Sequence, residues 1–275
     1  MGALPARAHR PPGAPLLSAI PPVLCYHRIG GPLELGVTRV ARSVFARQMR
    51  CLARAGWRTL TLAEFAERLR PHPPSPVPRP EVFLTFDDGD ADLARHAYPL
   101  LTDLGFTATT FVITGHIGRT NTWDGRYTWR RLAHLDWPAI EAWRARGLEF
   151  ASHTVTHPRL TWLDDGAVSD ELGRSRETLV ARLGADAGRA VAYPFGAWDA
   201  RIGDLAHVAG YELGFAGARA SGTPFNVPRV SVYVWDCWRV PFGLRGGRVG
   251  ALGRVLARAA NRCAVGTSVV RAVRW

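Results

Sequence analysis

The stretch Glu81-Val82-Phe83-Leu84-Thr85-Phe86-Asp87-Asp88-Gly89 decides the fold of this chain. From Val82 to Phe86 the residues are apolar, aromatic or β-branched, which predicts a buried β-strand over 81–86. Two adjacent carboxylates follow the strand, and Gly89 then allows a sharp turn. Strands disfavour Asp, and like charges repel each other. The pair therefore has either a chemical role at the strand end or the plainer role of a polar strand exit.

The same alternation of strand and helix extends along the chain in both directions. Strands are predicted over 22–27, 57–60, 107–113, 148–152, 190–193 and 213–216, and helices over 43–56, 61–70, 91–104, 137–146, 166–183 and 199–209. This pattern is typical of an α/β architecture with a mostly parallel sheet. The number of units favours a closed or nearly closed barrel over an open sheet. No strand is followed by a G-x-G-x-x-G or P-loop motif, which argues against an open-sheet nucleotide enzyme.

Composition limits the class of protein. The 275 residues, 47% of them hydrophobic, are enough for one large core or two small ones and exclude a fibrous or wholly disordered chain. The formal net charge is +12 and every cation is Arg, which favours anionic polymers, membrane surfaces or acidic substrates as partners. The cysteines are scattered with no C-x-x-C spacing, so we expect them to be reduced and not to bind zinc. They are Cys25, Cys51, Cys237 and Cys263.

Three regions are predicted. Residues 1–20, rich in Pro, Ala and Arg, are expected to form a flexible tail, 21–240 the catalytic domain, and 241–275 a basic extension; 71–80 is a Pro-rich linker or loop. In the extension an apolar face and a row of arginines predict an amphipathic helix that either packs on the barrel or lies on an anionic membrane surface. Its apolar face has Val249, Leu252, Leu256 and Ala259, and its arginines are Arg254, Arg258 and Arg262.

The expected location is the cytoplasm, at most peripheral to a membrane. No segment approaches the roughly 20 apolar residues that span a bilayer. The N-terminal stretch has early arginines, but prolines interrupt its apolar region, which makes it a poor secretory signal.

A pair of histidines follows the predicted strand 148–152. His153 and His157 lie on one face if the segment turns helically, so that both imidazoles reach one ion. With Asp88 they make two imidazoles and one carboxylate, a catalytic-type metal set that leaves positions open for water and substrate. Such a set suits zinc, cobalt or nickel. Hydrogen-bonded structural histidines are the alternative.

Three further residues lie at predicted strand ends. His27 ends the first strand, where it is either a proton donor or a structural histidine. Phe195, in the turn Tyr193-Pro194-Phe195-Gly196, either directs its N–H at an oxyanion or packs as an aromatic lid. Arg229, at the edge of a late strand, either orients a carboxylate or is one more surface arginine.

Four stretches of the chain, in their order along it, resemble the motifs of the polysaccharide deacetylase family. They are Tyr26-His27-Arg28, Thr85-Phe86-Asp87-Asp88-Gly89, Ser152-His153-Thr154-Val155-Thr156-His157 and Tyr193-Pro194-Phe195-Gly196. This is the NodB-homology fold of carbohydrate esterase family 4, and the resemblance covers residues 21–235. It implies a deformed (β/α)7 TIM-like barrel and a hydrolase that removes an N-acetyl group from an amino sugar as acetate.

Carried over residue by residue, the resemblance implies that Asp87 is the general base. It implies that Asp88, His153 and His157 hold a divalent metal, zinc before cobalt or nickel, and that the Phe195 N–H is the oxyanion donor.

Two departures from the family pattern matter. Many members have an Arg before the third motif that tethers the base, whereas this chain has Ala190-Val191-Ala192, so Arg229 is the candidate replacement. Many members also end with a His that acts as general acid, but no His follows His207 here. The chain is similar in this respect to the biofilm poly-N-acetylglucosamine deacetylases, which have the acid on the first strand, and His27 fits that place.

The expected substrate is an N-acetylated glycan or a lipid- or nucleotide-linked amino sugar, and no nucleic-acid partner is expected. Two other classes stay open: a hydrolase of O-acetyl esters or cyclic imides on the same barrel, and a non-catalytic glycan-binding protein. Tryptophans at the barrel mouth would stack on sugar rings or fill the core. They are Trp123, Trp129, Trp162 and Trp198.

Overall fold

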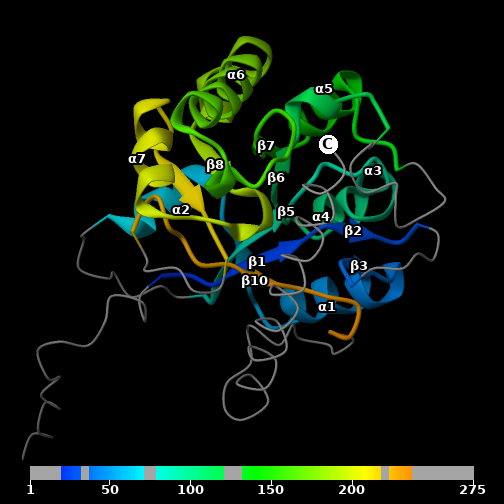
Figure 1. Cartoon of the computed structure of the whole chain (residues 1–275). Coiled ribbons are helices and arrows are strands. Elements are labelled where there is room, and N and C mark those ends of the chain that lie inside the picture. The colour runs from blue at the N-terminus through cyan, green and yellow to red at the C-terminus, as the bar shows by residue number, and fades with distance from the viewer. Residues whose placement is uncertain (1–19, 32–36, 71–78, 121–131, 218–222, 237–275) are drawn as a thin grey trace, which may run out of the picture.

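The computed structural model describes residues 20–31, 37–70, 79–120, 132–217 and 223–236. Its main element is a parallel sheet in the order β10-β1-β5-β6-β7-β8-β9, with β4 beside the start of β5 (Figure 1). The strands of this sheet are β1 (Val23–Tyr26), β4 (Arg58–Thr59), β5 (Glu81–Phe86), β6 (Thr109–Val112), β7 (Glu149–Ser152), β8 (Ala190–Ala192), β9 (Leu213–Phe215) and β10 (Val230–Ser231). A separate small sheet pairs β2 (Arg28–Ile29) with β3 (Arg39–Val40).

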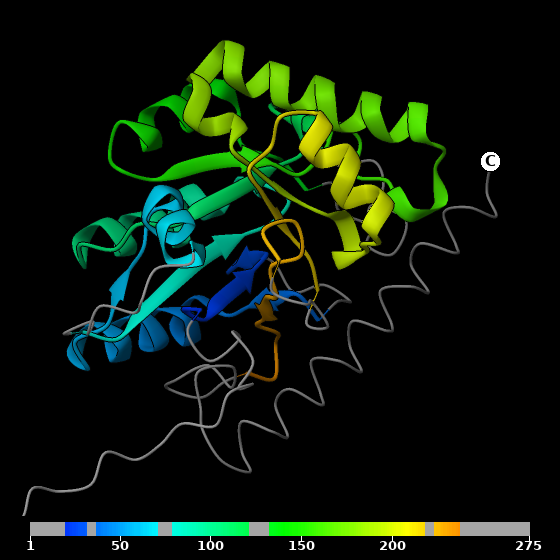
Figure 2. The ribbon, with the colours of Figure 1, turned by 90° about the vertical axis from the view of Figure 1, so that its left-hand side faces the viewer.

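Helices connect most of these strands. They are α1 (Arg42–Arg54), α2 (Leu62–Leu69), α3 (Leu93–His96), α4 (Tyr98–Asp103), α5 (Trp137–Arg144), α6 (Asp165–Leu183) and α7 (Ala200–Val208). Short 3-10 turns are η2 (Thr114–His116), η3 (Leu160–Trp162), η4 (Ala185–Gly188) and η5 (Pro194–Gly196). In both ribbon views α6 and α7 lie on the opposite side of the sheet from α1 (Figures 1 and 2).

The segment that leads into β10 joins the two edges of the sheet. Val227 forms a parallel bridge with Phe215 of β9, and its N–H donates to the Gly214 carbonyl at 2.9 Å. Three residues later, Val230 pairs with Leu24 of β1. The sheet therefore curls until both of its edges meet the same segment, which confirms the deformed barrel predicted from the sequence.

Alternate residues of the strands face the barrel interior, as the two-residue period of a strand requires. In β5, Leu84 and Phe86 pack in the cluster beneath the outer helices, whereas Phe83 packs inside the barrel with Phe215. Phe65 of α2 stacks on Phe83 with ring centroids 4.6 Å apart. The helix α2 thus fills the end of the barrel at which the strands begin and leaves the opposite end for other chemistry.

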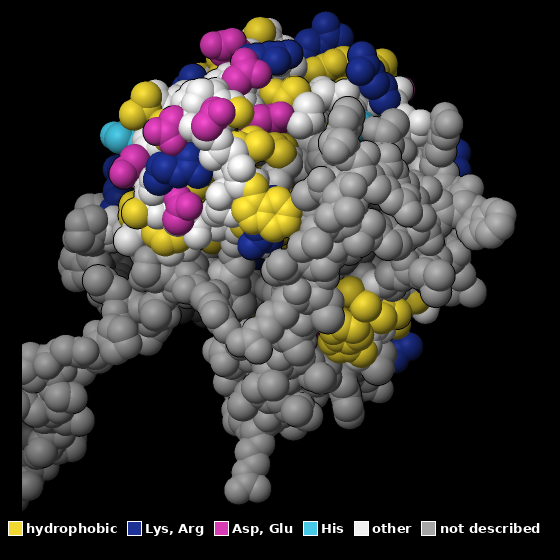
Figure 3. Space-filling model, viewed as in Figure 1, with side chains coloured by type: hydrophobic (Ala, Val, Ile, Leu, Met, Phe, Trp, Pro, Cys, Tyr) yellow, Lys and Arg dark blue, Asp and Glu magenta, His cyan; other side chains and the backbone are white. Residues whose placement is uncertain are grey.

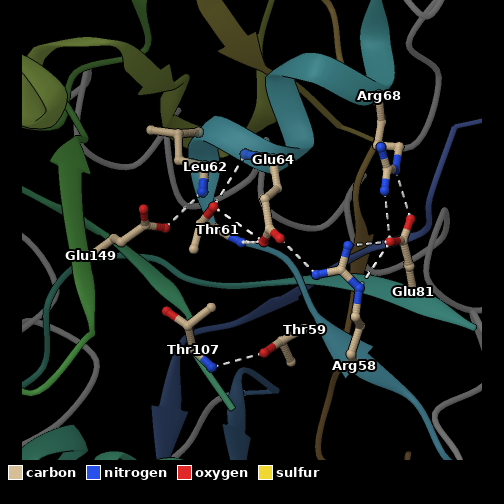
Figure 4. A network of polar contacts seen from close by, with 9 residues as sticks. All are labelled: Arg58, Thr59, Thr61, Leu62, Glu64, Arg68, Glu81, Thr107 and Glu149. Atoms are coloured by element: carbon tan, nitrogen blue, oxygen red, sulfur yellow. Dashed lines mark hydrogen bonds and ion pairs between the residues drawn. The ribbon is translucent and has the colours of Figure 1, made fainter. Parts of the chain in front are cut away.

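A half-buried carboxylate of β7 holds the start of α2 against the barrel (Figure 4). The predicted cap Thr61 forms a capping box with Glu64 at the first turn of the helix. Glu149 of β7 accepts the Leu62 N–H at 2.8 Å and the Thr109 hydroxyl at 2.9 Å. The start of α2 is therefore capped both by its own residues and by a side chain from the sheet.

Glu81, at the start of β5, forms a second part of the same network (Figure 4). It pairs with Arg58, next to α2, and with Arg68 in the last turn of that helix. The carboxylate is 4% exposed, whereas the two guanidinium groups are more than a third exposed. A buried anion at the start of β5 thus holds both the last turn of α2 and the strand β4.

Charged side chains of both signs mix on the surface of the described helices. On the face in Figure 3, acidic and basic groups alternate over the region of α6 and α7. Two of the exposed ion pairs are Arg174–Asp170 within α6 and Arg201–Asp165 between α7 and α6. The described part of this face therefore carries both charges in spite of the net charge of the chain.

One predicted helix is wrong in detail. The helix expected over 91–104 is split into α3, which ends at His96, and α4, which begins at Tyr98. Pro99 lies in the first turn of α4 and has no N–H to continue a helical ladder back to Arg95. The other predicted elements are observed with boundaries shifted by a few residues.

Several predictions concern residues outside the described ranges. These are the tail 1–20 apart from its last residue, most of the Pro-rich stretch 71–80, and the extension 241–275 with its amphipathic helix. Within the described ranges, no helix is long and apolar enough to cross a bilayer. The cytoplasmic location and the membrane-surface contact stay predictions.

Candidate active site

Asp87 and Asp88 follow β5 directly and face different partners. The interior face of β5 continues from Phe83 through Thr85 to Asp87, so Asp87 is buried, with 3% of its surface exposed. Asp88 has a left-handed backbone with a φ of 70°, and Gly89 follows at 73°. This turn directs the second carboxylate toward the loop that follows β7, where its Oδ1 meets two histidines.

Arg229 holds Asp87 through a two-point ion pair. Nη1 lies 2.6 Å from Oδ1 and Nη2 lies 2.8 Å from Oδ2, and both side chains are 5% exposed. The guanidinium carbon lies 5.5 Å from the centre of the Phe111 ring in the barrel interior. Parallel N–H···O bonds of this kind fix the plane of a carboxylate as well as its charge. The structure thus brings together the two residues that the sequence analysis named as base and base-orienting arginine.

Asp88, His153 and His157 present one donor atom each to a common point. The Nε2 atoms of His153 and His157 each lie 3.5 Å from Asp88 Oδ1. A tetrahedral ion with bonds of about 2.1 Å holds its ligand atoms about 3.4 Å apart, so this spacing fits such an ion. Asp88 Oδ1 is buried and accepts no hydrogen bond among the described residues. The donor set therefore fits a divalent cation on geometry.

The orientation of His153 supports the same conclusion. Its Nδ1 lies 2.7 Å from the carbonyl oxygen of Ala192, which only accepts, so Nδ1 carries the proton. In the neutral imidazole, Nε2 then has its lone pair directed at Asp88. A backbone carbonyl on the far nitrogen is a common outer partner of a metal-binding histidine.

The loop that carries the two histidines is not helical. Thr154 and His157 have left-handed backbones, with φ values of 66° and 60°. The expectation that a helical turn brings the two imidazoles together is therefore wrong, and the two left-handed residues bring them together instead. Such conformations persist for non-glycine residues only where the surroundings hold them.

Glu171 of α6 holds this loop. Its Oε2 accepts the N–H groups of Val155 and Thr156 at 2.8 and 2.9 Å, and its Oε1 accepts the Thr156 hydroxyl at 2.6 Å. From the other side, Thr114 N–H donates to the Thr154 carbonyl at 3.0 Å. The loop is thus fixed by α6 and by the segment after β6.

The charges of the site shift the pKa values of its acids and bases. Burial alone raises the pKa of Asp87, but the charge and hydrogen bonds of Arg229, together with the neighbouring imidazoles of His153 and His27, outweigh it and lower that pKa to about 2. Burial alone lowers the pKa of His153, but Asp87 and Asp88 raise it above its ordinary value. The two carboxylates that attract a proton to His153 equally attract a metal cation.

His27 and Cys25 line the same end of the barrel. The interior face of β1 continues from Val23 through Cys25 to His27, and the Cys25 thiol donates to Asp87 Oδ2 at 3.4 Å. Donor atoms of Cys25, His27 and Asp87 lie within 4.8 Å of one another. A cation at this second group would compete with Arg229 for Asp87, so the Asp88 group is the better fit for a divalent cation.

Phe195 lies in the turn η5 beside the histidines. It has a left-handed φ of 61°, and its ring packs edge-on against His157 with centroids 4.8 Å apart. The N–H of the next residue, Gly196, donates to the Tyr193 carbonyl at 2.9 Å. The structure thus places Phe195 next to His157, while its role as oxyanion donor stays a prediction.

Two of the four tryptophans predicted at the barrel mouth lie in the described ranges. Trp162 is 49% exposed and has the Arg159 guanidinium 5.3 Å from its ring centre, and Trp198 packs on the cluster beneath α6 and α7. Trp123 and Trp129 lie outside those ranges. Cys25 and Cys51 are free thiols, as predicted.

Three residues of the site were not predicted from the sequence: Cys25, His134 and Glu171. Cys25 has a signal, because alternate residues of a strand share a face and Cys25 lies two positions before His27. His134 contacts the backbone of Asp88, with Nδ1 2.8 Å from its carbonyl oxygen. His134 and Glu171 carry no signal, since each reaches the site from a segment distant in sequence.

A family model for polysaccharide deacetylases matches residues 75–214, half of the chain. The chain belongs to the polysaccharide deacetylase family. Members of this family are hydrolases that act on carbon–nitrogen bonds other than peptide bonds. The match includes Asp87, Asp88, His153, His157 and Phe195, whereas His27 and Arg229 lie on either side of it.

Curated relatives agree with this family. The Bacillus subtilis protein YxkH, which is named as a polysaccharide deacetylase, is 28% identical over 70% of this chain. The poly-β-1,6-N-acetyl-D-glucosamine N-deacetylase of Staphylococcus aureus is 26% identical over 70% of this chain. The alignments span 63% and 67% of the lengths of these two relatives.

Solved structures share the fold. The deacetylase PplD of Streptococcus pyogenes, in complex with acetate, superposes with a TM-score of 0.67 at 25% identity, over 78% of this chain and 93% of PplD. IcaB from Ammonifex degensii superposes with a TM-score of 0.64 at 28% identity, over 77% of this chain and 91% of IcaB. The curled parallel sheet with outer helices is therefore the deacetylase barrel.

Proposed function

We propose that this protein is a metal-dependent deacetylase that hydrolyses the N-acetyl group of an amino-sugar glycan and releases acetate. The observation that carries the proposal is the division of labour between two adjacent carboxylates. Asp87 pairs with Arg229, and Asp88 lies 3.5 Å from the Nε2 atoms of His153 and His157. One carboxylate is thus available for proton transfer and the other for a cation.

In this proposal Asp88, His153 and His157 hold a divalent ion, zinc before cobalt or nickel. Their imidazole and carboxylate donors suit such an ion, and three protein ligands leave positions open. When bound, the ion would polarise the acetyl carbonyl and acidify the attacking water.

Asp87 accepts the proton of that water. A carboxylate whose pKa is about 2 is a weak base in bulk water, so this role requires a strongly acidified water. Arg229 keeps the carboxylate ionised and fixes its plane toward the reacting centre. Asp87 therefore serves as an oriented acceptor whose geometry matters as much as its basicity.

Phe195 and His27 complete the reaction on the substrate. The Phe195 N–H donates a hydrogen bond to the oxygen that becomes negative when water attacks the acetyl carbon. His27, in its protonated form, transfers a proton to the sugar nitrogen as the C–N bond breaks. Acetate and the free amine then leave the site.

Two relatives support the choice of substrate class. The Staphylococcus aureus relative is named for poly-β-1,6-N-acetyl-D-glucosamine, and the Streptococcus pyogenes structure holds acetate. We therefore propose a polymer or oligomer of N-acetylglucosamine as the first substrate to test, with lipid- or nucleotide-linked amino sugars as the second.

A panel of acetylated compounds tests the proposal. Metal-free protein reloaded with zinc, cobalt or nickel is assayed for acetate release from N-acetylated oligosaccharides and an O-acetylated sugar, and for ring opening of a cyclic imide. Release from the acetamide supports the proposal. Hydrolysis of the ester or imide alone would replace it with that hydrolase, and tight glycan binding without any hydrolysis would indicate a binding protein.

A further inference from the structure

A short segment of irregular chain, residues 133–135, lies between the loop after β5 and the loop after β6. Isolated antiparallel bridges pair Asp90 with His134 and Thr120 with Ala133. Backbone hydrogen bonds run from Ala91 N–H to Ala133 O at 2.8 Å, from Leu135 N–H to Gly89 O at 2.8 Å and from His134 N–H to Arg119 O at 2.9 Å. The segment therefore braces the turn that carries Asp88.

The side chain of His134 acts on the same turn. Its Nδ1 lies 2.8 Å from the carbonyl oxygen of Asp88, and the residue is 7% exposed. Since a carbonyl oxygen only accepts, Nδ1 is the donor. Two consecutive carbonyls, those of Asp88 and Gly89, are thus held by the consecutive residues His134 and Leu135.

The hydrogen bonds from His134 and Leu135 hold a backbone turn in which Asp88 has a left-handed conformation. Asp88 has a φ of 70°, a conformation that costs free energy for a residue other than glycine, although less for Asp than for most, and that tertiary contacts help to hold. A change of the Asp88 backbone away from this conformation would reorient the side chain and move Oδ1 away from the Nε2 atoms of His153 and His157, each now 3.5 Å from it. The distance between the three donor atoms therefore depends on the peptide that His134 fixes.

We infer that His134 is a positioning residue that fixes the Asp88 turn and so sets the affinity of the Asp88, His153 and His157 group for a divalent cation. The inference rests on the proposed function in one respect, the ligand set. Partners of this kind outside the ligands typically change metal affinity by about 10- to 100-fold. His134 touches neither the cation nor substrate in this account.

Two amide variants separate positioning from general packing. In His134→Asn the side-chain nitrogen is the same number of bonds from the backbone as Nδ1 and donates to the Asp88 carbonyl. In His134→Gln the nitrogen is one bond farther away and misses it. Cobalt(II) is titrated into metal-free full-length wild type and both variants, the dissociation constant is taken from the visible absorption of bound cobalt, and metal-free melting temperatures are recorded.

We expect the Gln variant to bind cobalt about tenfold more weakly than wild type and the Asn variant to bind it nearly as tightly. Wild-type affinity in the Gln variant, or an equal loss in both variants, overturns the inference. Weak cobalt binding by the Asn variant overturns the inference by itself, even if the Gln variant fails to fold. A lower melting temperature with unchanged affinity also overturns it, since His134 then only stabilises the fold.

Asp88→Ala serves as the reference for the ligand set. If wild type and Asp88→Ala bind cobalt equally, the proposed metal group itself fails. If Asp88→Ala abolishes binding while His134→Gln leaves it unchanged, only the role of His134 fails.

Discussion

Arg229 and Asp87 lie 142 residues apart in the sequence and meet as a two-point ion pair inside the barrel. Arg229 comes from the segment that closes the sheet, and Asp87 from the end of β5. Closure of the barrel therefore supplies the partner that ionises and orients the carboxylate.

Removal of Arg229 is expected to lower the stability of the protein. Arg229→Met leaves the Asp87 carboxylate buried without a counter-charge, which typically destabilises a fold by about 3–5 kcal/mol. Arg229→Lys keeps a charge but loses the second hydrogen bond, so an intermediate cost is expected. Urea unfolding measures the free energy of unfolding of both Arg229 variants. The double variant Asp87→Asn/Arg229→Met is the control. A double variant less stable than Arg229→Met would contradict a stabilising role for the pair.

Substitutions of the two neighbouring carboxylates are expected to affect metal binding and acetate release differently. Asp87→Asn should keep metal binding and lose acetate release by about 10²-fold or more, because the proton acceptor is gone. Asp88→Asn and His153→Ala should lose both, since each removes a ligand. Metal content by elemental analysis and acetate release are measured on the same samples. Full activity in Asp87→Asn would show that the base is another residue.

Most of the scaffold is predictable from local patterns. The strand over 81–86 is found at its predicted bounds, because its apolar run ends abruptly in two carboxylates and a glycine. The cap Thr61 is found as predicted, since Thr followed three residues later by Glu marks a helix start. The helix predicted over 91–104 is the exception, because Pro99 separates α3 from α4.

The geometry of the site is harder to predict from the sequence than the strands and helices are. The left-handed conformations of Asp88, Thr154 and His157 occur at residues other than glycine, and no local pattern of the sequence predicts them at these positions. The contact between His134 and Asp88 joins positions 46 residues apart without a regular element at His134. Such features are fixed by tertiary contacts, which only the folded chain supplies.

Glu149 offers a test of how α2 is attached. Glu149→Leu leaves the Leu62 N–H and the Thr109 hydroxyl without their acceptor, so a loss of about 1–3 kcal/mol is expected. Glu149→Gln retains an acceptor oxygen. Burial raises the pKa of Glu149, so ionisation costs the folded state and the Gln variant should be at least as stable as wild type at neutral pH. Chemical unfolding is the measurement, and exposed Glu177→Leu is the control; equal stability of the two Glu149 variants would refute the capping role.

Glu81 predicts a dependence of stability on pH. Its hydrogen bond from Arg68, together with Arg58 and against the effect of burial, lowers its pKa below the ordinary 4.5. A lowered pKa in the folded state stabilises the protein above the unfolded-state pKa, and this contribution is lost as the pH falls through the folded-state value. The stability advantage of wild type over Glu81→Gln should therefore shrink between about pH 6 and about pH 3. Thermal unfolding of both proteins across that range is the measurement, and a constant difference would contradict the shift.

The most direct test of the account is acetate release from an N-acetylglucosamine oligosaccharide as zinc is added stepwise to metal-free wild-type protein. The account predicts no release without metal and a rise that ends when one zinc ion is bound per chain. Release that is independent of metal, or zinc binding without any release, would contradict it.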